Sequence, residues 1–298
     1  MRFDPNYVNS LATAVNQSSS VEASLTTELS SGLRVSSLQV DPVAVAQSAL
    51  LGSSISAGDT YVQAASGVQA MLQVTDSTLG AVVTQLTSAV SLAVQGNSGT
   101  LDSSNIATIG QQLAGIRDQV LSLANTSYLG SYLFSGSQGS VQPFTINSST
   151  PATTSYAGDS AVQYVQTPTG QQIQTNLPGT TLFGSTGSGV FAALNNLVAD
   201  FSSGSVSTTA VADSASLTSA LSQLSSQRSI LNNSLSRVES TSMSVQTNVA
   251  QLTGQQSALV AADPAMVATQ LKSAETQHQA LLSVISALSS TDLFSYLK

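Results

Sequence analysis

The chain has 298 residues, enough for one large domain or two ordinary ones, and its 41% of hydrophobic residues can form a sizeable core. Only 7% of the residues are charged, against roughly 25% in an average domain. Neutral polar residues and alanine hold the positions that charges normally take, so copies can pack closely with little electrostatic repulsion. The composition predicts a subunit that meets copies of itself.

The charge balance argues against several kinds of partner. The net charge is -8, and seven scattered cations without a basic run cannot neutralise nucleic acid or hold an anionic membrane surface. No unbroken window of about 18 apolar residues predicts a membrane span. Residues 1–7 lack the apolar stretch of a secretory signal, so we expect no cleaved signal peptide. Cysteine is absent, which excludes disulfides and thiolate metal sites.

Two helices are predicted in the N-terminal third. Apolar residues between Val8 and Leu29 recur at alternating steps of three and four, the spacing of a coiled-coil seam. Gly32 follows as a turn residue. Asp41 and Pro42 then give a helix start, with the carboxylate as N-cap and proline at the first helical position.

The longest predicted helix covers residues 42–95 and would be roughly 80 Å long. Ten of the thirteen seam positions between Leu51 and Ala93 are apolar, a pattern typical of a coiled coil or a long bundle helix. Four glycines inside it count against an unbroken helix: Gly52, Gly58, Gly67 and Gly80. A further helix is predicted at 104–125.

The C-terminal third mirrors this arrangement. A seam at 217–259 is again apolar in ten of thirteen positions, and Asp263 with Pro264 repeats the helix start and opens a last helix. We expect the seams at 51–93 and 217–259 to pack against each other within one chain. The two outermost helices could extend as a separate pair and join neighbouring subunits.

The middle of the chain has a different character. Glycines punctuate short β-type runs between residues 126 and 205, as at 162–165 and 173–177, which predicts short strands and hairpins. Helical spacing returns at 190–201. The predicted fold is therefore mainly α, with long helices from both chain ends and a small β-rich insertion. Its predicted parts are a terminal helical layer (1–40 and 263–298), a long-helix bundle (41–125 and 206–262) and the insertion (126–205).

No catalytic constellation can be assembled from this sequence. The single histidine, His278, lies on a seam and is interpreted as a packed residue rather than a base or ligand. There is no phosphate-binding loop, zinc-protease motif or nucleophile elbow, and the acidic residues are too dispersed for a carboxylate pair or a calcium loop. We expect no enzyme, no metal ligands and no cofactor.

Several segments, in order along the chain, resemble the hook–filament junction proteins of the bacterial flagellin superfamily. Residues 29–35 (LSSGLRV) followed by Asp41-Pro42 resemble its signature SG-x-R-hydrophobic…D-D-P, with Val40 in place of the first acid. Residues 121–136 resemble its LAN…G-x-Y-L-F-x-G stretch. Further similar segments are Tyr-Ala-Gly-Asp at 156–159, Asn-Leu-Pro-Gly at 176–179, Leu-Phe at 182–183 and the ending at 292–298, which is similar to S-L-x-x-Y-L.

The resemblance implies a role and a set of partners. It implies a ring of subunits between the hook-side junction protein and the flagellin filament, in the extracellular flagellum, after export without a cleaved signal peptide. It also implies that the terminal helices pair in an inner coiled-coil layer and that an export chaperone binds the C-terminal helix. Neither nucleic acid nor membrane is an expected partner.

On this hypothesis, apolar residues of the two terminal helices pack within and between subunits. The predicted assembly interface comprises Val8, Leu11, Val15, Leu25, Leu29, Leu271, Leu281, Ile285, Leu288, Leu293, Phe294 and Leu297. The predicted turn and caps are Gly32, Asp41, Pro42, Asp263 and Pro264.

Three other hypotheses remain open from the sequence. The first is a bulk filament flagellin, against which the segments at 132–136 and 176–179 count. The second is a secreted binding module or adhesin that acts through the insertion at 126–205. A hydrolase, testable at His278, is the least favoured.

Overall fold

The computed structural model describes residues 5–35, 37, 39–149 and 151–295, with side chains described from residue 9 to residue 287 outside those gaps. The chain divides into two compact units. The terminal unit comprises Met1–Ser56 and Asn248–Lys298, and the central unit comprises Ala57–Thr247. The predicted class, mainly α with a small β-containing insertion, is confirmed.

The helices follow the predicted seams closely. The terminal unit contains α1 (Pro5–Ser31), α7 (Pro264–Ser295) and one end each of α2 (Pro42–Gly96) and α6 (Ala210–Val260). The central unit contains the rest of α2 and α6, with α3 (Ser103–Ala124), α4 (Gly179–Phe183) and α5 (Gly189–Ser202). The predicted helices at 42–95 and 104–125 and the return of helical spacing at 190–201 are thus confirmed.

All thirteen positions of each long seam are buried or half-buried, which is the outcome expected if the seams at 51–93 and 217–259 pack inside the protein. Leu72, Leu79 and Leu86 of α2 and Leu217 and Leu224 of α6 have no exposed surface. Helix α2 is unbroken despite its glycines. One of these, Gly80, faces α6 so closely that a Cβ atom would lie 3.1 Å from Nη2 of Arg228.

Polar pairs join α2 and α6 inside the central unit. Nε and Nη2 of Arg228 donate hydrogen bonds of 2.7 and 3.0 Å to the two carboxylate oxygens of Asp76. Both residues occupy polar positions of the predicted seams. Nε2 of Gln69, a third polar seam position, donates to Glu239 at 2.9 Å. A polar residue at a seam position specifies register, so these pairs fix how the two helices align in this unit.

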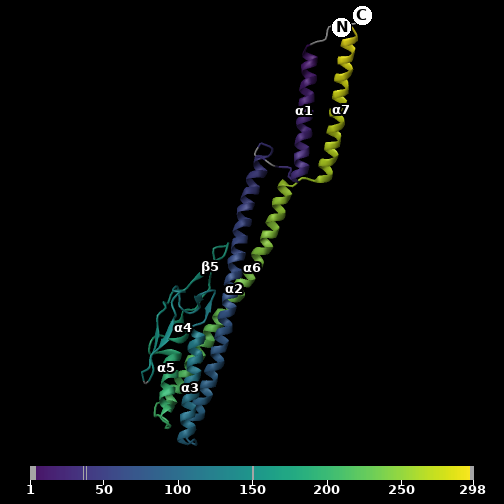
Figure 1. The fold of residues 1–298 in the computed structure, drawn as a ribbon. Coiled ribbons are helices and arrows are strands. Elements are labelled where there is room, and N and C mark those ends of the chain that lie inside the picture. The colour runs from purple at the N-terminus through teal and green to yellow at the C-terminus, as the bar shows by residue number, and fades with distance from the viewer. Residues whose placement is uncertain (1–4, 36, 38, 150, 296–298) are drawn as a thin grey trace. The chain divides into compact units, whose positions relative to one another are not determined.

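The described residues of the insertion form three antiparallel hairpins of two strands each. They are β1 (Ser127–Tyr128) with β2 (Ser131–Tyr132), β3 (Phe144–Ile146) with β4 (Thr154–Tyr156), and β5 (Tyr164–Gln166) with β6 (Gln172–Gln174). Figure 1 shows the hairpins on the side of the long helices, near α4 and α5.

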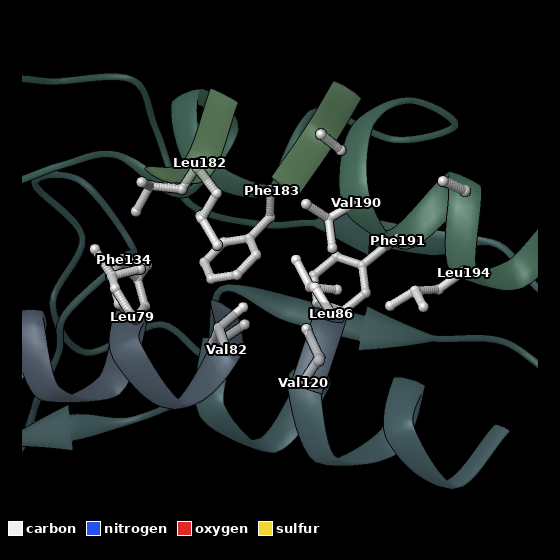
Figure 2. Packing of buried hydrophobic residues seen from close by; sticks show 14 of the residues in the cluster. Leu79, Val82, Leu86, Val120, Phe134, Leu182, Phe183, Val190, Phe191 and Leu194 are labelled. Carbon is white, nitrogen blue, oxygen red and sulfur yellow. The ribbon is translucent and has the colours of Figure 1, made fainter. Parts of the chain in front are cut away.

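An aromatic cluster attaches the insertion to the helices of the central unit. Phe144 of β3 packs 5.4 Å from Phe183 of α4 and 5.1 Å from Phe191 of α5, measured between ring centroids. Figure 2 shows Leu79, Val82 and Leu86 of α2 facing the side chains of α4 and α5. The side chains of Phe144, Phe183 and Phe191 have at most 2% of their surface exposed. The hairpins therefore share one core with the helices.

In the described part of the chain, α2 contains the one window that is long and apolar enough to cross a membrane by length and composition, with a mean hydropathy of 1.4. A third of this window is buried inside the protein. A core helix of a soluble protein passes the same test. The seam of α2 faces the protein core, as the apolar face of a bundle helix does.

Candidate assembly interface

The terminal unit pairs the two ends of the chain. Helices α1 and α7 lie side by side and antiparallel (Figure 1). Their contact is centred on Leu25, Val267 and Ala274, each with less than a tenth of its surface exposed, and Leu271 packs against this group. Such a small buried cluster leaves most of the two seams only partly covered.

The predicted interface residues differ in how much of their surface is exposed on this pair of helices. Leu25 is buried, and Leu29 is 39% exposed. The half-buried members are Leu11, Val15, Leu271, Leu281 and Ile285. The side chains of Val8, Leu288, Leu293 and Phe294, and the whole of Leu297, lie outside the described residues. A half-buried seam residue still presents apolar surface that a further partner could cover.

The segment that connects α1 to α2 is hydrogen-bonded to the segment that connects α6 to α7. Gly32 ends α1 with φ +68°, and its carbonyl accepts a hydrogen bond of 2.9 Å from the amide of Ala262. Leu33 pairs with Ala261 in an isolated antiparallel bridge. The amide of Arg34 donates to the carbonyl of Val260, and its guanidinium donates to the carbonyl of Leu259, each at 2.9 Å.

Arg34 thus binds the free carbonyls at the C-terminal end of α6, where a cation is also favoured by the helix dipole. The predicted motif at 29–35 therefore has a structural role in one subunit. The sequence marked the residues but gave no signal for the contact with residues 259–262, which lie more than 200 positions away.

Each break is followed by a capped helix start. The carboxylate of Asp41 accepts the amide of Ala44 at 3.0 Å, with Pro42 as the first residue of α2. The carboxylate of Asp263 accepts the amides of Ala265 and Met266 at 2.9 and 3.3 Å, and α7 begins at Pro264. Both carboxylates satisfy amides that lack an intrahelical partner.

Gln256 of α6 and Ser48 of α2 are in polar contact in the terminal unit. Nε2 of Gln256 donates to the carbonyl of Ser48 at 2.9 Å. Gly52 makes room for it, since a Cβ atom there would lie 3.2 Å from the same nitrogen. The helices therefore approach closely at this point.

Exposed apolar surface is concentrated in the terminal unit. Among the residues whose exposure is described, nine of the seventeen large hydrophobic residues that stand exposed belong to it, although it holds little more than a third of the chain. Leu50 is 71% exposed and borders a groove of about 520 Å³. The groove is lined by Gln47, Leu50, Leu51, Gln255, Ala258 and Leu259.

Sequence reasoning missed this groove, because Leu50 and Ala258 are off the seam positions. A search for apolar residues beside the seam would have found Leu50. His278 is half-buried on α7, and its Nδ1 atom has no hydrogen-bond partner among the described residues. Within the same residues, no group of three or more His, Cys, Asp or Glu side chains could hold a metal ion.

Two family profiles match the chain. Residues 6–139 match the bacterial flagellin N-terminal helical region, and residues 215–297 match the bacterial flagellin C-terminal helical region. Together they cover both units outside most of the insertion.

Curated relatives match over a shorter segment. The chain is 31% identical over 118 residues to flagellar hook-associated protein 3 of Salmonella typhimurium strain LT2, and 30% identical to its namesake in Escherichia coli K12. These matches cover 39% of this chain and 37% of each relative, so the chain spans little more than a third of the length of the curated relatives it matches.

Solved structures share the fold over a larger part of the chain. Flagellar hook-associated protein 3 of Legionella pneumophila aligns with a TM-score of 0.62 at 15% identity, over 70% of this chain and 98% of that one. FlgL of Xanthomonas campestris aligns with a TM-score of 0.58 at 18% identity, over 68% and 98%. At these identities the likeness concerns the fold.

Proposed function

Because the chain belongs to the bacterial flagellin family, we propose that it is a structural adaptor subunit that joins the flagellar hook to the filament. The observation that carries this proposal is the terminal unit, in which the paired helices α1 and α7 leave seam residues half-buried. The relatives named hook-associated protein 3 support the junction role over that of the filament itself.

The proposed mechanism is packing. Leu11, Val15, Leu281 and Ile285 are half-buried in one copy, and association would remove the rest of their apolar surface from water. Each square ångström of apolar surface buried contributes about 25 cal/mol. Electrostatic repulsion between copies would be small, since only 7% of the residues are charged.

The proposal extends to partners and place. Copies of the chain would form a ring in the extracellular flagellum, with the hook-side junction protein on one side and flagellin on the other. An export chaperone would bind α7 in the cytoplasm, as an amphipathic helix seated in a groove. The structural role needs no catalytic residue.

A strain deleted for this chain tests the role. We expect hooks without attached filaments, and flagellin monomers in the culture medium, because flagellin would be exported with nothing to nucleate on. Loss of filaments with no flagellin in the medium would instead make this chain the filament subunit. Normal motility would refute both roles and favour a binding function of residues 126–205.

Ile285 tests the packing mechanism. We expect Ile285→Val to support filament attachment, since removing one methyl group costs roughly 0.5–1.5 kcal/mol even where it is well packed. Ile285→Asp should abolish attachment, because an unpaired charge would be buried in the interface. The measurement is motility and electron microscopy of flagella in the complemented deletion strain.

Ser283→Asp is the matched control, because it places the same charge at an exposed position of the same helix. It should leave attachment intact. Filament growth with Ile285→Asp, at normal cellular levels of the variant, would contradict the role of this seam.

A further inference from the structure

The turn between β1 and β2 carries an unusual residue. Tyr128 pairs with Ser131, which leaves Leu129 and Gly130 as a two-residue turn with φ angles of +50° and +83°. A turn of this kind needs positive φ at both central residues, and Asn, Asp and Gly are the residues that adopt it readily. Leu129 is the sole non-glycine residue with positive φ in the described part of the chain.

Leu129 is also the most exposed of the large hydrophobic residues that the structure describes, at 90%. Leucine therefore carries two costs here, backbone strain and the exposure of apolar surface to water, and its own chain covers only about a tenth of its surface. Strain of this kind is concentrated at functional positions.

The β1–β2 hairpin, which carries Leu129 at its turn, is anchored to the core by the residues that follow β2. Just after β2, Leu133 and Phe134 are 8% and 0% exposed and belong to the core of the central unit. The amide of Leu133 donates to the carbonyl of Thr126 at 3.1 Å, and the amide of Tyr132 donates to the carbonyl of Gly139 at 2.8 Å. The turn thus projects the leucine from a hairpin whose base is attached to the core of the central unit.

The surroundings of Leu129 restrict its partner. No charged residue occurs between Asp118 and Asp159, so the surface that receives the hairpin needs no charged groups. The groove in the terminal unit satisfies this condition, because it is lined by two leucine residues of α2, by Ala258 and Leu259 of α6, and by two glutamines. Its volume of about 520 Å³ is ample for a leucine side chain.

A second cavity of about 290 Å³, beside Tyr61 in the central unit, fits less well. Half of its lining residues are polar: Thr60, Tyr61, Gln166 and Thr167. A leucine seated there would remove polar groups from water without pairing them.

We propose that Leu129 of one copy inserts into the groove formed by Leu50, Leu51, Ala258 and Leu259 of a second copy. The projection and the groove are different surfaces of one chain, so the contact is heterologous and repeats from copy to copy, as a ring requires. This inference rests on the proposed function, since it identifies one contact through which copies of the adaptor would join.

Cross-linking tests the contact directly, because the natural chain has no cysteine. Full-length chains carrying Leu129→Cys and full-length chains carrying Ala258→Cys would be expressed together, with distinguishable tags, in the deletion strain. We expect a disulfide-linked pair that contains both tags in isolated flagella. The matched control replaces Leu129→Cys by Val94→Cys, another exposed position of the central unit, and should give no such pair.

Attached filaments without the mixed pair would overturn the inference and leave the adaptor function standing. A cross-link from position 129 to hook protein or flagellin would also overturn it, because the occupant would be another chain. Normal filaments in the uncomplemented deletion strain would refute the proposed function, independently of cross-linking.

Leu129→Asn separates an assembly role from a folding role. Asparagine suits the positive φ and removes the exposed apolar side chain, so we expect the thermal midpoint of the purified chain to rise while filament attachment falls at least tenfold. Val211→Asn, at an exposed position of α6, should leave attachment unchanged. A lower thermal midpoint, or unchanged attachment, with Leu129→Asn would overturn the inference.

Discussion

Asp76 and Arg228 show how single polar residues act on the seams between α2 and α6. The hydrogen bond from Arg228 is the largest cause of the lowered pKa of Asp76. Burial opposes it, and the charge of Arg228 and a hydrogen bond with Asn232 lower the pKa further. The hydrogen bond between Arg228 and Asp76 also raises the pKa of Arg228. Both results describe a carboxylate and a guanidinium that stabilise each other's charged form.

The pair predicts a pH dependence of stability. Because the pKa of Asp76 is lower in the folded chain than its ordinary value of 3.8, the stability it contributes is present above pH 3.8 and is lost as the pH falls below that value. Asp76→Asn should therefore cost about 1 kcal/mol at pH 7, a small value because the Arg228 side chain is 35% exposed.

Urea unfolding of the natural chain and Asp76→Asn at pH 7 and pH 3 measures this effect. The difference in the free energy of unfolding should shrink at pH 3. A difference that stays constant between the two pH values would show that the ion pair is not its source.

At the scale of elements, the break after α1 depends on Gly32. Its φ of +68° is in the left-handed region, and no atom lies within 4 Å of where a Cβ would stand. The cost of Gly32→Ala is therefore conformational and should be about 1 kcal/mol. Gly254 lies within α6 of the same unit, also with open space around it, and Gly254→Ala should stabilise the chain by about 0.5–1 kcal/mol.

Thermal or urea unfolding of the two variants measures the change in the free energy of unfolding. We expect a decrease for Gly32→Ala and an increase for Gly254→Ala, and a general effect of adding a methyl group cannot produce opposite signs. Stabilisation by Gly32→Ala would mean that the segment after α1 adopts another backbone conformation in solution.

At the scale of the whole molecule, the two units have buried cores of very different size. The core of the central unit draws buried side chains from α2, α3, α5, α6 and the insertion, whereas that of the α1–α7 pair rests on Leu25, Val267 and Ala274. Regions with few buried apolar contacts open at a lower free energy. The proposed adaptor role accounts for this difference, because neighbouring subunits would then cover the seams of α1 and α7.

Limited proteolysis of the purified chain tests this difference. We expect cleavage within residues 1–35 and 265–298 first, with a fragment close to residues 57–247 persisting longest. Mass spectrometry of the fragments identifies the sites. Equal protection of the ends in the free monomer would contradict the prediction that partner subunits stabilise them.

The positions of the helices could be predicted from sequence because their signals are local. The heptad spacing marked α2 and α6, and the Asp-Pro pairs at 41–42 and 263–264 marked the starts of α2 and α7. The division into 1–40 with 263–298, 41–125 with 206–262 and 126–205 stays a prediction. Strand pairs were less visible, since β3 and β4 have three residues each, too few for an alternating pattern.

For the candidate interface, the sequence by itself determined which faces of α1 and α7 are apolar, because that follows from the order of side chains along a helix. Only the tertiary structure decided that Gly32, Leu33 and Arg34 bind residues 259–262, that Gly80 leaves space for Arg228, and that Leu129 stands exposed at positive φ. Such contacts join residues far apart in the chain or depend on a backbone angle. A seam repeating every seven residues fits several registers equally well, and the polar pairs that select one are defined only when both helices are in place.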